Sequence, residues 1–173
     1  MASPISNSTA PGIALTCPNV LLAAAPAFTA VGNTIGESSQ AKFQLPLTGG
    51  FLVFNDSPPV RLLPLIEKLA SFSALTPNWD SYGALTINPL CIAASVQLAL
   101  QLIGPEIPIP FAAPTVGGGV QLEWHRREMD FEIYIESPSK ISVFFSDENS
   151  GEELSFDISD QFDLFRMYLD RMK

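Results

Sequence analysis

Three glycines at 117–119 run directly into a segment in which apolar and polar residues alternate. Successive side chains of a β-strand point to opposite faces, so Val120, Leu122 and Trp124 are predicted to enter a core while the residues between them face outward. The same alternation returns at 131–136, after a short polar connection of the kind that closes a β-hairpin. This period of two favours an antiparallel sheet with one buried and one polar face.

Two further apolar runs, at 141–145 and 154–158, each follow turn-forming residues. Upstream, 42–56 is typical of a hairpin whose first strand lies at a sheet edge, because it contains Pro46. Short polar connections favour antiparallel neighbours. The sequence therefore predicts an α+β fold: an antiparallel four-stranded meander with two or three helices packed on one face, plus an N-terminal hairpin and an extended arm.

Three helices are predicted. The first ends near Phe72, and the second begins at Asn88, an N-cap followed by proline, and stops at Gly104. Ser159 is predicted to cap the last one. The four prolines within 105–114 indicate an extended connection between the second helix and the glycine turn.

The N-terminal region differs in composition, since the first 36 residues carry no charged side chain. We expect residues 1–40 to form an extended arm, with Val20 and Phe28 among its anchors, and 41–173 to form a single α+β domain. Two prolines interrupt the apolar run at 13–31, which disfavours a transmembrane helix, and no basic residue precedes it as in a secretory signal. The arm offers a means of docking to a larger assembly.

The net charge is −9, and 13 of the 18 acidic residues lie from Gln121 onward. Nucleic acid binding needs a basic surface, so this distribution argues against it and favours either a basic protein partner or simple solubility. Charged residues make up 16% of the chain and hydrophobic ones 47%, whereas roughly 25% of an average soluble domain is charged. We therefore expect a partner to cover some apolar surface.

The polar face of the predicted sheet has two interpretations. It is either a solvated face kept soluble by its acids, or an interface in which Tyr134 and Phe144 form an aromatic centre and carboxylates form a rim that steers a basic partner. Its predicted members are Gln121, Glu123, Glu132, Tyr134, Glu136, Ser142, Phe144, Glu153, Ser155 and Asp157.

The loop at 77–84 combines turn formers with two aromatic residues. In one interpretation Trp79 and Tyr82 cap the core while the Asp80 carboxylate accepts hydrogen bonds from local backbone N–H groups. In the other, Asp80, Ser81 and Tyr82 line a recognition pocket.

The sequence Asn-Trp-Asp-Ser-Tyr-Gly-Ala at 78–84, paired with Gly-Gly-Val-Gln-Leu-Glu-Trp at 118–124, resembles a widespread group of small bacterial proteins of unassigned function. The match covers roughly residues 60–136. The resemblance implies a bacterial origin and a meeting of the two motifs in space, and it carries no catalytic residue with it.

Catalytic signals are sparse. His125 is the only histidine and shares its predicted strand face with Glu123, but Ser81 as nucleophile lacks the Gly-x-Ser-x-Gly setting. A metal site built from Glu123, His125 and Glu132 is weakly specified. The glycine run precedes a strand and lacks a lysine, so it indicates a positive-φ turn or a close backbone approach under Trp79, and not a phosphate loop.

Cys17 and Cys91 form no CxxC pair, which favours buried or half-buried thiols and a reducing, cytoplasmic setting. No catalytic residue, metal or cofactor is predicted, and neither membrane nor nucleic acid is an expected partner.

We therefore predict a non-catalytic protein-interaction protein, an acidic neutralising partner of a basic effector, antitoxin-like or immunity-like. Two alternatives remain: a small enzyme or ligand-binding domain using Asp80, Tyr82, Glu123 and His125, and a structural subunit that docks through the uncharged arm. The predicted interaction residues are Trp79, Asp80, Tyr82, Glu123, Glu132, Tyr134, Glu136 and Phe144.

Overall fold

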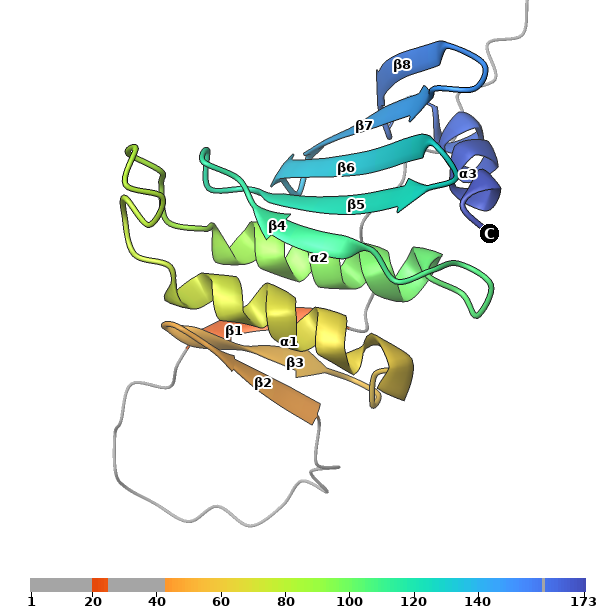
Figure 1. Ribbon diagram of the computed structural model, residues 1–173. Coiled ribbons are helices and arrows are strands. Elements are labelled where there is room, and N and C mark those ends of the chain that lie inside the picture. Colours follow the sequence, from red (N-terminus) through yellow and green to blue (C-terminus); the bar gives the residue numbers. More distant parts are fainter. Residues whose placement is uncertain (1–19, 25–42, 160) are drawn as a thin grey trace, which may run out of the picture.

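The computed structural model describes residues 20–24, 43–159 and 161–173. They form two antiparallel sheets and three α-helices (Figure 1). The strands are β1 (Val20–Ala24), β2 (Phe43–Leu47), β3 (Gly50–Phe54), β4 (Phe111–Pro114), β5 (Val120–Arg126), β6 (Met129–Ser137), β7 (Lys140–Asp147) and β8 (Glu152–Asp157). The helices are α1 (Leu63–Ser71), α2 (Pro89–Leu102) and α3 (Phe162–Arg171), with 3-10 turns at Val60–Leu62 and Phe72–Ala74.

The helices α1 and α2 lie between the two sheets (Figure 1). The smaller sheet has the strand order β1-β3-β2 and the larger one β4-β5-β6-β7-β8. Helix α3 packs on the same buried side of the larger sheet, where the ring of Phe165 lies 5.7 Å from that of Phe131. No helix or strand among the described residues covers the opposite side of the larger sheet. We call that side the open face.

The predicted alternation along the larger sheet is confirmed. Val120, Leu122 and Trp124 are 0%, 1% and 4% exposed, whereas the residues between them are only partly buried. Strands β6 and β7 repeat the pattern. The indole Nε1 of Trp124 donates to the carbonyl oxygen of Pro108 at 2.7 Å, which satisfies the one polar atom that this side chain brings into the core.

The α+β class is confirmed, but the four-stranded meander is wrong because the larger sheet has five strands. The additional strand, β4, falls in the segment that the prolines suggested was only a connection. Pro114 pairs with Val120 at the end of β4, which is an edge strand. Proline is tolerated there, because one side of an edge strand has no hydrogen-bonding neighbour.

The predicted hairpin at 42–56 is confirmed as β2 and β3, with a positive φ of 85° at Gly49 in its turn. It is part of a larger unit, since β1, from the predicted arm, pairs with β3 and makes a three-stranded sheet. Val20 pairs with Phe54 and is 7% exposed, as expected for an anchor of the arm. Phe28, Cys17 and the remainder of the predicted arm lie outside the described residues.

Two predicted helix caps had different outcomes. Asn88 caps α2 as predicted, with its Oδ1 accepting a hydrogen bond from the backbone N–H of Leu90 at 2.9 Å. Ser159 does not cap α3, because the N-cap is Gln161 and its side chain makes no capping hydrogen bond. The N–H of Ile158 still donates to the carbonyl of Ile141 at 3.0 Å, so the chain remains tied to β7 until just before Ser159.

Candidate interaction surface

The open face is organised in rows, because the strand register aligns outward side chains across the sheet. The central row crosses all five strands. It places two neighbouring carboxylates between two phenylalanines and consists of Phe111, Glu123, Glu132, Phe144 and Ser155. A second row consists of Ala113, Gln121, Tyr134, Ser142 and Asp157, and a third of His125, Asp130, Ser146 and Glu153.

Glu123 and Glu132 stand directly opposite each other on β5 and β6. The Oε2 of Glu132 accepts hydrogen bonds from the Gln121 amide at 3.0 Å and from the Tyr134 hydroxyl. Burial, and then the hydrogen bond to Glu132, raise the pKa of Tyr134 to about 12, so its hydroxyl remains a donor at neutral pH. Neighbouring polar groups thus hold Glu132 in place.

His125 lies between two carboxylates at the end of β5. Its Nδ1 is 2.6 Å from Asp130 Oδ1, and its Nε2 is 3.2 Å from Glu123 Oε2. The hydrogen bond with Asp130, followed by that with Glu123, raises the pKa of His125 above its usual value of 6.5. Both ring nitrogens face a carboxylate, so when the imidazole is protonated it places a positive charge between Glu123 and Asp130.

The aromatic residues of the open face include one that the sequence prediction missed. Tyr134 and Phe144 are half-buried, as expected for residues that alternate with core positions. Phe111 is 62% exposed and pairs with Glu123 from the neighbouring strand. In the sequence Phe111 is a lone phenylalanine among prolines, and it can be assigned to the open face only once β4 is known to be a strand. Glu136 is also exposed and forms an ion pair with Lys140 near the corner of the open face.

The loop at 77–84 is held by its own hydrogen bonds. Asp80 Oδ1 accepts from the N–H groups of Tyr82 at 2.8 Å and Ala84 at 3.0 Å, and these bonds lower the pKa of Asp80. This confirms the predicted structural role of the carboxylate. The predicted capping of the core by Tyr82 is wrong, since Tyr82 is 94% exposed. Positive φ values at Ser81 and Gly83 accompany its outward position. Trp79 is half-buried and donates to the Leu85 carbonyl at 3.1 Å.

The segment after this loop meets the glycine turn. The N–H of Leu85 donates to the Val116 carbonyl at 2.9 Å, and that of Asn88 donates to the Gly118 carbonyl at 2.8 Å. Gly118 has a φ of 85°, and a Cβ there would lie 2.7 Å from the Thr86 carbonyl oxygen. The positive-φ turn is therefore confirmed, and the backbone that approaches it closely at Gly118 is that of Thr86.

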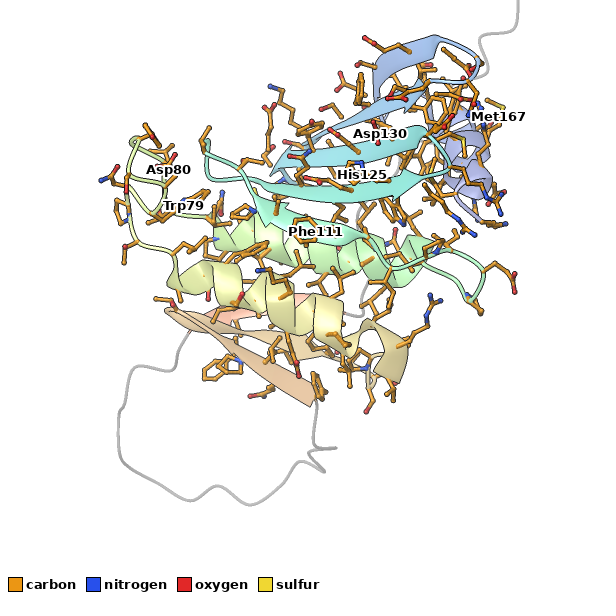
Figure 2. All side chains as sticks on the ribbon, viewed as in Figure 1. Trp79, Asp80, Phe111, His125, Asp130 and Met167 are labelled. Carbon is orange, nitrogen blue, oxygen red and sulfur yellow. The ribbon has the colours of Figure 1, made fainter. Side chains whose placement is uncertain are left out.

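The residues of the enzyme alternative come from different places in the fold. Figure 2 shows Asp80 in a loop at one end of the larger sheet and His125 well along β5. From Val120 to His125 the strand advances by roughly 16 Å at about 3.3 Å per residue.

Among the described residues, no group of three or more His, Cys, Asp or Glu side chains has a metal-binding arrangement. Cys91 is a buried free thiol.

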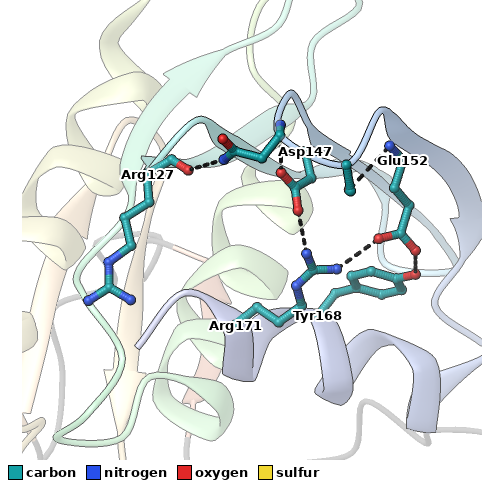
Figure 3. Close-up of polar contacts among 7 residues, drawn as sticks. Arg127, Asp147, Glu152, Tyr168 and Arg171 are labelled. Atoms are coloured by element: carbon teal, nitrogen blue, oxygen red, sulfur yellow. Dashed lines mark hydrogen bonds and ion pairs between the residues drawn. The ribbon is translucent and has the colours of Figure 1, made fainter.

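A second polar cluster escaped the sequence analysis. Arg171 on α3 donates to Asp147 Oδ2 at 2.5 Å and to Glu152 Oε2 at 2.8 Å, and the Tyr168 hydroxyl donates to Glu152 (Figure 3). The guanidinium also lies 4.7 Å from the centre of the Phe145 ring. This cluster fastens α3 to the turn between β7 and β8, and it faces the buried side of the sheet. We assign it a structural role.

Comparisons with models of protein families, with curated proteins and with solved structures found no match for this chain. None of the helices in the described part of the chain is long and apolar enough to cross a membrane.

Proposed function

We propose that this chain is a non-catalytic interaction protein that binds a basic protein through the open face of its larger sheet. The observation that carries this proposal is the central row, in which Glu123 and Glu132 lie side by side between Phe111 and Phe144. Interfaces commonly combine aromatic anchors with a polar rim, and charge complementarity speeds association. Both features are present on the open face, which no helix or strand among the described residues covers.

The opposed carboxylates give a physical reason to expect a cationic partner. Like charges directly opposite each other in a sheet destabilise it by about 0.2–1 kcal/mol per pair. Gln121, Tyr134 and His125 reduce this cost by hydrogen bonding, but only His125 brings a positive charge when protonated. A guanidinium or ammonium group from a partner, placed over Glu123 and Glu132, would remove the repulsion and gain an attraction.

In its most specific form, the proposal is that the partner is a basic effector that this protein neutralises, in the manner of an antitoxin or an immunity protein. The net charge of −9 supports this form, since it accelerates encounter with a positively charged surface. Asp80 lies in a loop at one end of the larger sheet, whereas His125 lies well along β5, and this disfavours the alternative of an enzyme built from those residues with Tyr82 and Glu123.

A second candidate, a subunit that docks to a larger assembly, is favoured by one observation on the smaller sheet. The outward side chains of β1 and its neighbours are uncharged, and Leu21 among them is 54% exposed. Light scattering after size exclusion distinguishes this candidate. Assembly through β1 predicts a multimer that Leu21→Lys dissociates, and a monomeric wild type contradicts self-assembly.

Affinity capture from cells of the source organism tests the main proposal. Wild type is compared with Glu132→Lys/Glu136→Lys, which reverses charge on the open face, and with Glu106→Lys/Glu148→Lys, which makes the same net change at exposed sites in two turns. We expect wild type and the control to retain the same basic protein, releasable by salt, and the open-face variant to lose it. Recovery of no basic protein, or equal recovery by all three chains, would contradict the proposal.

A further inference from the structure

The glycine turn borders a groove at the corner of the open face. The groove measures about 440 Å³, within the range of roughly 300–1,000 Å³ that is typical of ligand sites. Pro114, Val116 and Gly117 line one side, and Tyr134 and Glu136 line the other. One wall is therefore mainly apolar, with Val116 64% exposed, while the other ends in a carboxylate.

The fold holds this groove open. The turn is fixed by hydrogen bonds from Gly118 N to the Thr115 carbonyl at 3.0 Å and from Gly119 N to Thr115 Oγ1 at 2.9 Å. Gly119 is pressed against β6, since a Cβ there would lie 2.5 Å from the Ile135 carbonyl oxygen. Gly117 is different, because a Cβ at this position meets no atom within 4 Å. Because Gly117 has no side chain, there is open space beside this hydrogen-bonded turn.

We infer that this groove receives one long cationic side chain, arginine or lysine, from the basic partner. The inference rests on the proposed function and specifies how the partner engages the open face. Arginine and lysine combine an apolar stem with a charged head and often lay the stem along apolar surface. Here the stem would lie along Pro114 and Val116, and the head would reach Glu136 and the ring of Tyr134, a carboxylate and a cation–π acceptor.

Glu136 already has a cationic neighbour, Lys140, and a cation from the partner would have to displace it. Lys140 pairs with it across the β6–β7 turn, and the side chains are 65% and 54% exposed for Lys140 and Glu136 respectively. Ion pairs this exposed contribute little to stability, so an incoming cation can replace Lys140 at small cost. A lysine or arginine that also packs its stem in the groove has an advantage over Lys140.

The test is an NMR titration of the full chain with N-acetyl-arginine methylamide, and in parallel with the lysine and norleucine equivalents. We expect saturable shifts of the backbone amide signals of Val116, Gly117, Gln121, Tyr134 and Glu136 with the two cationic probes, and much smaller shifts with norleucine. Shifts that are absent, or equal for norleucine, would overturn the inference.

The matched variants are Gly117→Leu and Gly104→Leu. At both positions an added Cβ meets no atom within 4 Å and φ is not positive, but only Gly117 lines the groove. We expect Gly117→Leu to abolish the probe shifts and Gly104→Leu to retain them. If Gly117→Leu leaves both the probe shifts and capture of the basic protein intact, the groove inference fails while the proposed function stands. If wild type captures no basic protein, the proposed function fails, and with it the partner named here.

Discussion

Glu123 on β5 and Glu132 on β6 face each other across one register position of the open face, flanked by Phe111 on one side and Phe144 on the other. A sheet selected only for its own stability would not gain from two acids at this position, since opposed like charges cost free energy. The proposed function accounts for the arrangement, because a basic partner would add positive charge to the one that protonated His125 places beside Glu123. The stability and the binding of the protein should therefore respond in opposite directions to removal of these charges.

The first prediction concerns stability. Glu132→Gln keeps an acceptor for Tyr134 and Gln121 but removes the repulsion from Glu123, so we expect the free energy of unfolding to rise by about 0.2–1 kcal/mol at neutral pH. Urea denaturation followed by fluorescence measures it. Glu148→Gln, an exposed acid in the β7–β8 turn, is the control and should change stability less. A loss of stability in Glu132→Gln that exceeds that of the control would contradict the predicted repulsion.

The second prediction concerns the pKa of His125. As this chain has one histidine, its imidazole can be followed without ambiguity by NMR. We expect a pKa above 6.5 in the folded protein, and a larger decrease on Asp130→Asn than on Glu123→Gln, because the bond to Asp130 is the shorter and contributes most to the shift. Equal or absent decreases would show that the two carboxylates do not hold the ring as described.

The direction of the resulting pH dependence follows from linkage. A folded-state pKa above the unfolded value means that the folded chain binds the proton more tightly. The contribution of His125 to stability is therefore fully present below about pH 6.5, the unfolded value, and is lost as the pH rises through the folded pKa. His125→Gln should remove this part of the pH dependence of unfolding.

An element of this fold could be predicted from the sequence where neighbouring residues alone indicate it. The alternation at Val120, Leu122 and Trp124 and the cap at Asn88 are local patterns, and the structure contains both as predicted. The pairing of β1 with β3 and that of β4 with β5 left no such local pattern, because a short strand in an uncharged arm or among prolines is recognised only once its partner strand is known.

The same distinction holds for the candidate site. Glu123, Glu132, Tyr134 and Phe144 could be assigned to one face because strand alternation fixes it. Phe111 could not, because its membership of the central row depends on the pairing of β4 with β5. The outward position of Tyr82 depends on backbone angles within its loop, which residue types alone did not determine.

The third prediction concerns the anchoring of α3. Arg171→Met removes the guanidinium from Asp147 and Glu152, of which the Asp147 side chain is 9% exposed, so we expect a lower midpoint of urea denaturation. Lys173→Met is the control, because its pair with Asp170 is exposed and should contribute little. Equal midpoints for the two variants would contradict a structural role of the cluster.

Acid should reduce the effect of Arg171→Met. The hydrogen bond from Tyr168, followed by that from Arg171, lowers the pKa of Glu152. A lowered folded-state pKa means that this stabilisation is present above the unfolded pKa and is lost as the pH falls through the folded one. The difference between wild type and Arg171→Met should therefore shrink on acidification below about pH 4.

The fourth prediction compares neighbouring glycines. Alanine at Gly119 places a Cβ 2.5 Å from the Ile135 carbonyl oxygen, whereas alanine at Gly117 meets nothing within 4 Å. Overpacking of this kind costs about 1–3 kcal/mol, so Gly119→Ala should be destabilised by that amount and Gly117→Ala scarcely changed. Thermal or urea unfolding of the two variants checks the order. The reverse order would mean that the glycine turn does not lie against β6.

The most direct measurement is the dissociation constant of the captured basic protein, determined by isothermal titration calorimetry for wild type and for Glu123→Gln/Glu132→Gln. If the central row is the binding site, the variant should bind at least about tenfold more weakly, a loss of about 1.4 kcal/mol, although its own fold is no less stable. An unchanged dissociation constant in a stably folded variant would contradict the assignment of the open face as the surface that this protein uses.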